Sequence, residues 1–329
     1  MKILLAAPHL HEQRGNAVTV KRIGSALTKI GANVVILDIT LPETSRLPNT
    51  DIIHAFHARR FQEFCDKTGF EPGAYIITMT GTDLNHDLFD PHGRKLVIKC
   101  LSKARLIHVF NKESASILTN ADNAFGKKTV VIHQGADEFL MKLNIKKSGP
   151  FTFFLPAAIR KVKNIPAAIE MLELLRKQEY TFRLLLAGPI LEKVEGEKVM
   201  ALVEKHADWI DYAGVVPHAE MGKLYEQADA VLNTSITEGQ PAAILEAMQA
   251  RLPVLVSGNN GNRSIITHND NGLIYETDEQ FAAYAAQLLL DASLRQRLGE
   301  AAHAHVEAVH SSEYEARTLL DLYKKILQA

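Results

Sequence analysis

Short apolar runs alternate with amphipathic segments along nearly the whole chain, and this alternation restricts the fold more than any other feature. The runs are rich in Val, Ile and Leu without polar alternation, which predicts strands buried on both faces. Strands that alternate with helices indicate βαβ units and a parallel sheet. In the first half, the predicted strands are Lys2–Ala7, Asn33–Ile39, Asp51–Ala55, Ala74–Met79, Leu106–Phe110 and Thr129–Ile132, and Asn16–Ile30 is a predicted helix.

A polar stretch, Lys146–Pro150, interrupts the alternation, which then begins again. Because 329 residues is about twice the usual size of one domain, we predict two doubly wound domains, at residues 1–148 and 149–310. A last helix is predicted at 311–329, opened by a capping box of Ser312 and Glu315, and it could pack back on the first domain. The predicted strands of the second half are Phe151–Leu155, Phe182–Ala187, Trp209–Tyr212, Ala230–Asn233, Val254–Ser257 and Gly272–Tyr275; the helices are Pro166–Lys177, Glu192–His206, Ala219–Gln227, Pro241–Arg251 and Glu279–Ala292.

The composition excludes several classes of protein. The 37 Lys and Arg residues are balanced by 38 Asp and Glu residues, so the basic excess of a nucleic-acid binder is missing. Two cysteines, Cys65 and Cys100, cannot build a disulfide framework or a Cys-rich metal site. The apolar N-terminus is interrupted by Pro8 and His9, and no run approaches the ~20 apolar residues that cross a bilayer. We therefore predict a cytoplasmic protein.

The segment Asn233–Met248 carries the strongest functional signal. Two carboxylates, Glu238 and Glu246, are separated by seven residues, the first in a predicted loop and the second in the next helix. Pro241 suits the first turn of that helix, where its missing N–H has no cost. The loop Glu238–Gln240 would then present backbone N–H groups to an anion or a hydroxyl. Taken alone, a helical glutamate such as Glu246 is usually a solvated surface residue.

The whole phrase resembles the Glu-x7-Glu signature of retaining glycosyltransferases of family 4, among the group 1 glycosyl transferases. The resemblance implies an α/β fold of the GT-B type, with two facing Rossmann-like doubly wound domains and a C-terminal helix. Three more segments are similar to family motifs: the Arg–Lys loop within Leu155–Asn164, the strand that ends in Gly188, and the loop Gly214–His218 that approaches the nucleotide base.

The resemblance also implies roles for residues of the second domain. Arg160 and Lys163 would bind the diphosphate of the donor and balance the charge of the leaving group. Without the family context, these two residues would be a solvated basic loop, and Lys161 is an alternative to Lys163. Glu246 would contact the ribose, and Glu238 the hexose. The catalytic candidates here are Glu238, Arg160 and Lys163, and the substrate-binding candidates are Glu246, Gly239, Gln240, Pro241, Ala242, Gly188 and Val215.

The first domain would bind the acceptor. Gly15 and Asn16 lie in a loop similar to the acceptor-side loop of the family, although Asn16 could alternatively cap a helix. Asp83 lies in a region similar to the one near the transferred sugar and is a catalytic candidate, although it could alternatively cap a turn. His57 is a substrate-binding candidate. Its spacing from His54 suggests a metal site, but neither a third ligand nor a paired-acid motif is present, so we predict no metal and no cofactor.

These features predict a retaining glycosyltransferase. It would move a hexose or N-acetylhexosamine from a nucleotide diphosphate sugar, with a UDP-sugar preferred, to a small-molecule or glycan acceptor. Short phrases such as Thr80–Asp83 resemble a sub-branch with glycosyltransferase 1 domain-containing proteins and selenosugar synthases. Two alternatives remain: a sugar-nucleotide epimerase with Asp83 and His57 as acid and base, and a non-catalytic sugar-nucleotide sensor.

The segment Arg94–Arg105 mixes basic and apolar residues, as do helices that lie on anionic lipid. A helix packed on the sheet with a solvated basic face explains the same residues, and we favour this interpretation. The sequence indicates no oligomeric state.

Overall fold

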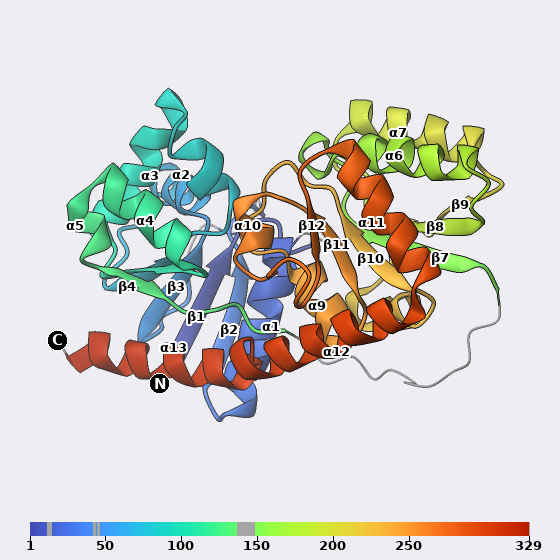
Figure 1. Cartoon of the computed structure of the whole chain (residues 1–329). Helices are drawn as coiled ribbons and strands as arrows, with labels where there is room; N and C mark the ends of the chain where they lie inside the picture. The colour runs from blue at the N-terminus through green and yellow to red at the C-terminus, as the bar shows by residue number, and fades with distance from the viewer. Residues whose placement is uncertain (12–14, 42–43, 45–46, 137–148, 329) are drawn as a thin grey trace. The chain divides into compact units, whose positions relative to one another are not determined.

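The structure, a computed structural model, describes residues 1–11, 15–41, 44, 47–136 and 149–328. The chain forms two compact units (Figure 1). Unit 1 consists of Met1–Gly135 and Val309–Ala329, and unit 2 of Ala136–Ala308. The sequence predicts domain boundaries at residues 148 and 310 instead, and part of the predicted linker lies outside the described residues.

Unit 1 is built on a parallel sheet with the strand order β2-β1-β3-β4-β5-β6. Neighbouring residues of a strand face opposite sides, so Leu4 packs in one core and Leu5 in the other. The strands are β1 (Lys2–Ala7), β2 (Asn33–Asp38), β3 (Ile52–Phe56), β4 (Tyr75–Thr78), β5 (Leu106–Val109) and β6 (Thr129–Val131); the helices are α1 (Gly15–Lys29), α2 (Ala58–Thr68), α3 (Pro91–Lys103), α4 (Lys112–Ala121), α5 (Asn123–Gly126) and α13 (Ser312–Gln328), with a π-helical turn at Asp83–Asp87.

Unit 2 has a parallel sheet with the strand order β12-β11-β10-β7-β8-β9. Counted from its own first strand, this is the 3-2-1-4-5-6 order of dinucleotide-binding folds. In such sheets, ligands bind beyond the carboxyl ends of the strands where the order reverses, which here lies between β7 and β10. The strands are β7 (Phe151–Pro156), β8 (Phe182–Ala187), β9 (Ile210–Tyr212), β10 (Ala230–Asn233), β11 (Val254–Ser257) and β12 (Leu273–Tyr275); the helices are α6 (Ile165–Lys177), α7 (Lys193–Lys205), α8 (Met221–Tyr225), α9 (Ala242–Gln249), α10 (Asn260–Arg263), α11 (Asp278–Leu290) and α12 (Ala292–Val309), with 3-10 turns at Lys161–Lys163 and His218–Glu220.

Helices cover both faces of each sheet. In unit 2, α6 and α7 lie on one side of the sheet, and α9 and α12 on the other (Figure 1). Phe153 packs against the first group, and Phe154 packs against the second. The predicted doubly wound α/β fold is confirmed, and every predicted strand is found with ends that differ by at most one residue.

Some predicted helices differ from the observed ones. The helix predicted at Ala219–Gln227 is a 3-10 turn followed by the short helix α8, and α2, α4, α5 and α10 were not predicted. The helix α3 buries Val97 and Leu101 and leaves Lys95 exposed, which agrees with a helix packed on the sheet. Lys99 forms an ion pair with Asp66, with 2.7 Å between Nζ and Oδ1.

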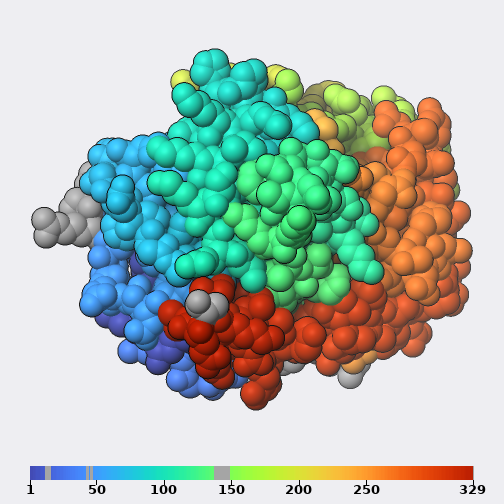
Figure 2. Space-filling view, turned by 90° about the vertical axis from the view of Figure 1, so that its left-hand side faces the viewer, coloured from blue at the N-terminus to red at the C-terminus, as the bar shows by residue number. Residues whose placement is uncertain are grey.

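The capping box predicted for α13 is wrong. The Ser311 hydroxyl, and not Ser312, accepts a hydrogen bond from the Tyr314 N–H, at 3.2 Å. The Glu315 carboxylate instead accepts from Arg22 of α1 and from the Gly135 N–H. Both side chains of this ion pair are almost fully buried. The space-filling view shows the outer side of α13, in dark red, beside the blue N-terminal segments (Figure 2).

A second set of buried polar groups joins α13 to the sheet of unit 1. The Ile132 carbonyl accepts from His108 Nε2 at 3.1 Å, so His108 Nδ1 must accept from the Thr78 hydroxyl, at 2.8 Å. The Thr78 oxygen then accepts from His54 Nε2 at 2.5 Å, and His54 Nδ1 accepts from the Tyr323 hydroxyl at 2.6 Å. Burial lowers the pKa of both histidines, so both rings are neutral, as this directional chain requires.

Replacing Tyr323 with Phe is expected to lower the free energy of unfolding by about 1–3 kcal/mol. The substitution removes the hydroxyl that donates to His54 Nδ1, so a buried acceptor loses its hydrogen bond. Urea denaturation measures the change. The matched control is Tyr314→Phe on the same helix, because the Tyr314 side chain is exposed. Equal stability of the two variants would contradict the importance of the Tyr323 hydroxyl.

Candidate active site

The loops that follow β7 and β10 meet at the point where the strand order of unit 2 reverses. The Ile236 N–H donates to the Val162 carbonyl at 2.9 Å, and the Thr234 hydroxyl donates to the Lys163 carbonyl at 3.0 Å. These bonds bring Lys163 to Glu238, with 2.5 Å between Nζ and Oε1. The structure thus joins two residues that the sequence predicts to be catalytic, although they are 75 positions apart.

The Glu238 carboxylate is held by several donors. Its Oε1 accepts from the Ser235 hydroxyl at 2.6 Å and from Asn233 Nδ2 at 3.2 Å, besides Lys163. Burial acts to raise the pKa of Glu238, but the Lys163 ammonium and these hydrogen bonds outweigh it and hold the pKa below its usual value. The side chain is therefore an oriented anion, and it is 11% exposed.

The segment that follows β11 packs closely against this carboxylate. A Cβ at Gly261 would lie 2.6 Å from the Cβ of Glu238, so only glycine fits there. The fully buried Asn262 donates from Nδ2 to the Ser257 carbonyl at 2.9 Å and to Asn233 Oδ1 at 3.3 Å. This segment therefore fixes Asn233, which in turn donates to Glu238.

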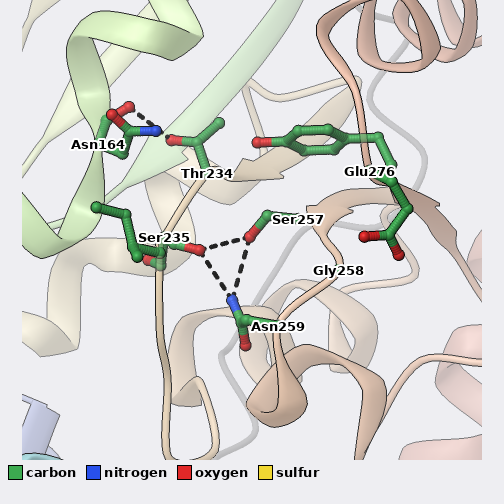
Figure 3. Close-up of a pocket in the computed structure, with 9 residues that line it drawn as sticks. Asn164, Thr234, Ser235, Ser257, Gly258, Asn259 and Glu276 are labelled. Carbon is green, nitrogen blue, oxygen red and sulfur yellow. Dashed lines mark hydrogen bonds between the residues drawn. The ribbon is translucent and has the colours of Figure 1, made fainter. Parts of the chain in front are cut away.

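A hollow of about 250 Å³ lies among the segments that follow β10, β11 and β12 (Figure 3). Ser235 lines the hollow and also donates to Glu238. Its carbonyl accepts from the Ser257 hydroxyl at 2.6 Å and from Asn259 Nδ2 at 2.9 Å, as the dashed lines show (Figure 3). Hydroxyl, amide and carboxylate groups line this space together with the apolar side chain of Ile236. Such a lining suits a hydroxylated ligand.

Arg160 lies at the start of the Lys161–Lys163 turn. Its Nε is buried and has no hydrogen-bond partner among the described residues. An unpartnered buried guanidinium nitrogen is costly, and an anion would satisfy it. Lys161, the alternative to Lys163, is exposed, and its backbone N–H donates to Glu192 at 2.9 Å. Lys163, and not the exposed Lys161, contacts Glu238.

Glu246 is not the solvated residue that its helical position suggests. It is buried on α9. Its Oε2 accepts from the Tyr225 hydroxyl at 2.9 Å, and its Oε1 lies 2.8 Å from His218 Nε2. The sequence alone predicts neither partner. His218 ends the predicted base-binding loop, whereas no local signal marks Tyr225, because it is 21 positions away in an ordinary amphipathic segment.

The loop between Glu238 and α9 differs slightly from the prediction. Pro241 is the N-cap of α9 and Ala242 its first residue, so the placement of Pro241 inside the first turn is wrong by one position. Gly239 is half-buried and Gln240 is buried.

Two further candidates follow strands β8 and β9. Gly188 has φ +150°, and a Cβ there would lie 2.2 Å from the Ala157 carbonyl oxygen, so the turn requires glycine. Val215 is exposed.

The candidates of unit 1 are brought together at the ends of its strands. Asn16 is the second residue of α1 and not its N-cap, and its amide donates to the Thr80 hydroxyl at 3.1 Å. Gly15 is the first residue of that helix. The fully buried Asp83 accepts from the backbone N–H groups of Ala58 at 2.9 Å and Thr80 at 2.9 Å. Asp83 therefore organises this loop, as the alternative interpretation of a turn cap predicts.

His57 joins β3 to α2. Its backbone is left-handed, with φ 67°, and its Nε2 lies 4.0 Å from Asp87 Oδ2. Its Nδ1 is buried without a hydrogen-bond partner in the described part of the chain. No group of three or more metal-ligating side chains occurs among the described residues. In the same ranges, no helix is both long and apolar enough to span a bilayer.

Comparisons with known proteins identify the family. Residues 137–305, about half of the chain, match the model of the family described as Glycosyl transferases group 1. The chain belongs to this family. This glycosyltransferase is 27% identical over 333 residues to Glycosyltransferase 1 domain-containing protein 1 of Xenopus tropicalis, covering 97% of this chain and 96% of that one. It is also 26% identical to the alpha-monoglucosyldiacylglycerol synthase of Acholeplasma laidlawii, over 56% of this chain and 46% of that protein.

Solved structures resemble this glycosyltransferase over its whole length. Sucrose-phosphate synthase from Thermosynechococcus elongatus matches with a TM-score of 0.82 at 15% identity, covering 100% of this chain and 99% of that one. Anabaena HepE in complex with UDP-glucose matches with a TM-score of 0.81 at 14% identity, covering 99% and 100%. These likenesses confirm the predicted GT-B fold.

Proposed function

We propose that the protein is a retaining glycosyltransferase that moves a hexose or N-acetylhexosamine from a UDP-sugar to a hydroxylated acceptor. The observation that carries the proposal is the Lys163–Glu238 pair at the strand-order reversal of unit 2, with Arg160 on the same loop as Lys163. Two structural neighbours, Anabaena HepE and S. aureus TarM, are described as complexes with UDP-glucose and with UDP and alpha-GlcNAc-glycerol, respectively. Those descriptions support a UDP-sugar as the donor.

Each group would act on a different part of the donor. Arg160, whose buried Nε has no partner in the described residues, would bind the diphosphate together with Lys163. Glu246 would accept hydrogen bonds from the ribose, and the polar loop at Glu238 would hold the hexose. Because two cations would balance the charge of the leaving group, the proposal requires no metal ion.

Retention would follow from attack on the same face of the sugar. The glycosidic bond to the phosphate oxygen breaks, the acceptor oxygen bonds to the anomeric carbon, and the leaving phosphate takes the acceptor proton. In this mechanism Glu238 would not act as the nucleophile; its Oε1 accepts from Lys163 and Ser235. The carboxylate would instead stabilise the positive charge that develops on the sugar ring.

We further propose that the strand ends of unit 1, around Asn16 and His57, bind the acceptor.

No observation favours the alternative of an epimerase, because Asp83, one of its two required acid and base groups, is buried and bonded to backbone amides. Release of UDP that depends on an added acceptor would distinguish transfer from epimerisation. Thermal stabilisation by a panel of nucleotide sugars would identify the donor sugar.

Replacing Arg160 with Ala is expected to weaken binding of UDP and of the UDP-sugar by about 2–5 kcal/mol, because a desolvated charge pair with the diphosphate would be lost. Binding of uridine, which has no phosphate, should be unchanged. Calorimetry with the three ligands measures the difference. Lys161→Ala is the matched control, since Lys161 is a neighbouring but exposed cation. Equal losses for uridine and UDP would show that Arg160 does not contact the diphosphate.

A further inference from the structure

The carboxylate of Glu246 has one donor on each oxygen. His218 Nε2 lies 2.8 Å from Oε1, and the Tyr225 hydroxyl lies 2.9 Å from Oε2. The donors come from two elements, the turn His218–Glu220 and the helix α8, whereas Glu246 belongs to α9. The plane of the carboxylate is therefore fixed from both sides.

The chemistry of both partners defines the direction of these bonds. A carboxylate can only accept, so the hydrogen lies on Nε2 of His218. Burial and the nearby Glu246 raise the pKa of Tyr225 well above its ordinary value, so its phenol stays protonated and donates. The side chain of Glu246 is 7% exposed and that of His218 is 34% exposed, so a ligand that reaches the carboxylate must pass close to the imidazole.

We infer that His218 and Tyr225 are positioning residues that hold Glu246 in the orientation that selects a ribonucleotide over a 2′-deoxyribonucleotide. This inference rests on the proposed function, in which Glu246 binds the ribose. Each oxygen of a carboxylate can accept more than one hydrogen bond, so the two oxygens can each take one hydroxyl of the ribose cis-diol. A nucleotide that lacks the 2′-hydroxyl leaves one of these acceptors without its ligand.

The fixed orientation is what makes the missing hydroxyl costly. A carboxylate free to rotate would lose conformational entropy when it engages both hydroxyls, which would offset part of the second hydrogen bond. A carboxylate that His218 and Tyr225 already hold loses little more. Removing either positioning residue should therefore lower the affinity for the ribonucleotide more than the affinity for the 2′-deoxyribonucleotide.

The test compares dissociation constants of UDP and 2′-deoxy-UDP by calorimetry. The base and the diphosphate are the same in both ligands, so the ratio isolates the 2′-hydroxyl. The wild-type protein is expected to prefer UDP by about tenfold or more, the range expected for one buried hydrogen-bonding group. His218→Ala and Tyr225→Phe should each reduce the ratio to about threefold or less. His218→Gln, whose side-chain amide can donate, should recover part of the preference.

The matched control is His303→Gln. His303 is in the same unit, but its ring contacts the Gln249 carbonyl at 3.0 Å, and this variant should keep the wild-type ratio. If the role of His218 were purely structural, His218→Ala would weaken the binding of UDP and of 2′-deoxy-UDP by the same factor. An unchanged ratio in His218→Ala and Tyr225→Phe, with UDP binding still lost in Arg160→Ala, would overturn this inference and leave the proposed function standing. Failure of the wild-type protein to bind UDP would overturn both.

Discussion

Replacing Glu238 with Gln is expected to lower kcat by about 100-fold or more, which corresponds to about 2.7 kcal/mol in the activation free energy. Glutamine keeps the size of the side chain but removes its charge. In the structure this carboxylate is an anion held by Lys163 and Ser235. If it lies beside the sugar ring, its charge matters most when the ring becomes positive, so the loss appears in kcat.

Steady-state kinetics at saturating acceptor measures this effect. Glu246→Gln is the matched control, because it makes the same chemical change at a residue proposed to contact a part of the donor that does not react. We expect that variant to raise KM for the donor and to keep kcat within about tenfold of the wild-type value. A wild-type kcat in Glu238→Gln would show that the loop after β10 is not catalytic.

Replacing Arg22 with Ala is expected to lower the free energy of unfolding by about 3–5 kcal/mol. Arg22 and Glu315 form an ion pair whose side chains are 3% and 1% exposed. Removing the guanidinium leaves a buried carboxylate that still accepts from the Gly135 N–H but has lost its charged partner, and an uncompensated buried charge is strongly destabilising. Urea denaturation, which keeps the ionic strength constant, measures the change.

The same helix provides the control for this second prediction. Arg317 forms an ion pair with Glu313, but both side chains are more than 60% exposed. Exposed pairs contribute little, so Arg317→Ala should change the free energy of unfolding by less than about 1 kcal/mol. Similar losses in Arg22→Ala and Arg317→Ala would mean that burial of the first pair has no energetic importance.

The strands of this fold could be predicted from the sequence because their signal is local. A strand buried on both faces must be apolar at every position, as Lys2–Ala7 and Phe182–Ala187 are nearly throughout. Short helices such as α5 and α10 have only four residues each, which is too few for a periodic pattern. They form because side chains of the loop cap them, as Asp122 caps α5.

Contacts between distant segments could not be predicted in the same way. Glu315 fits the pattern of a capping box, but Arg22, 293 positions away, takes its carboxylate. Glu246 fits the pattern of a solvated helix, yet it is buried against Tyr225. In both cases a donor that is distant in the sequence holds the carboxylate, in place of the local contact or the solvent that the sequence pattern indicates. Lys163 and Glu238 could be predicted only as members of two separate motifs. Their contact depends on the order of β7 and β10 in the sheet, and neither motif contains that information.

The position of α13 has a consequence for biosynthesis. Ala316, Leu319 and Tyr323 belong to the same buried cluster as Ile3 and Leu5, so the core of unit 1 uses both early and late segments of the chain. Unit 2 is continuous in the chain, whereas unit 1 needs a segment that is made after the whole of unit 2. The first 135 residues must wait, with one face of their sheet incompletely covered, until Ser312–Gln328 has been synthesised. The half of the protein that is made first therefore cannot finish folding before all of unit 2 has been synthesised.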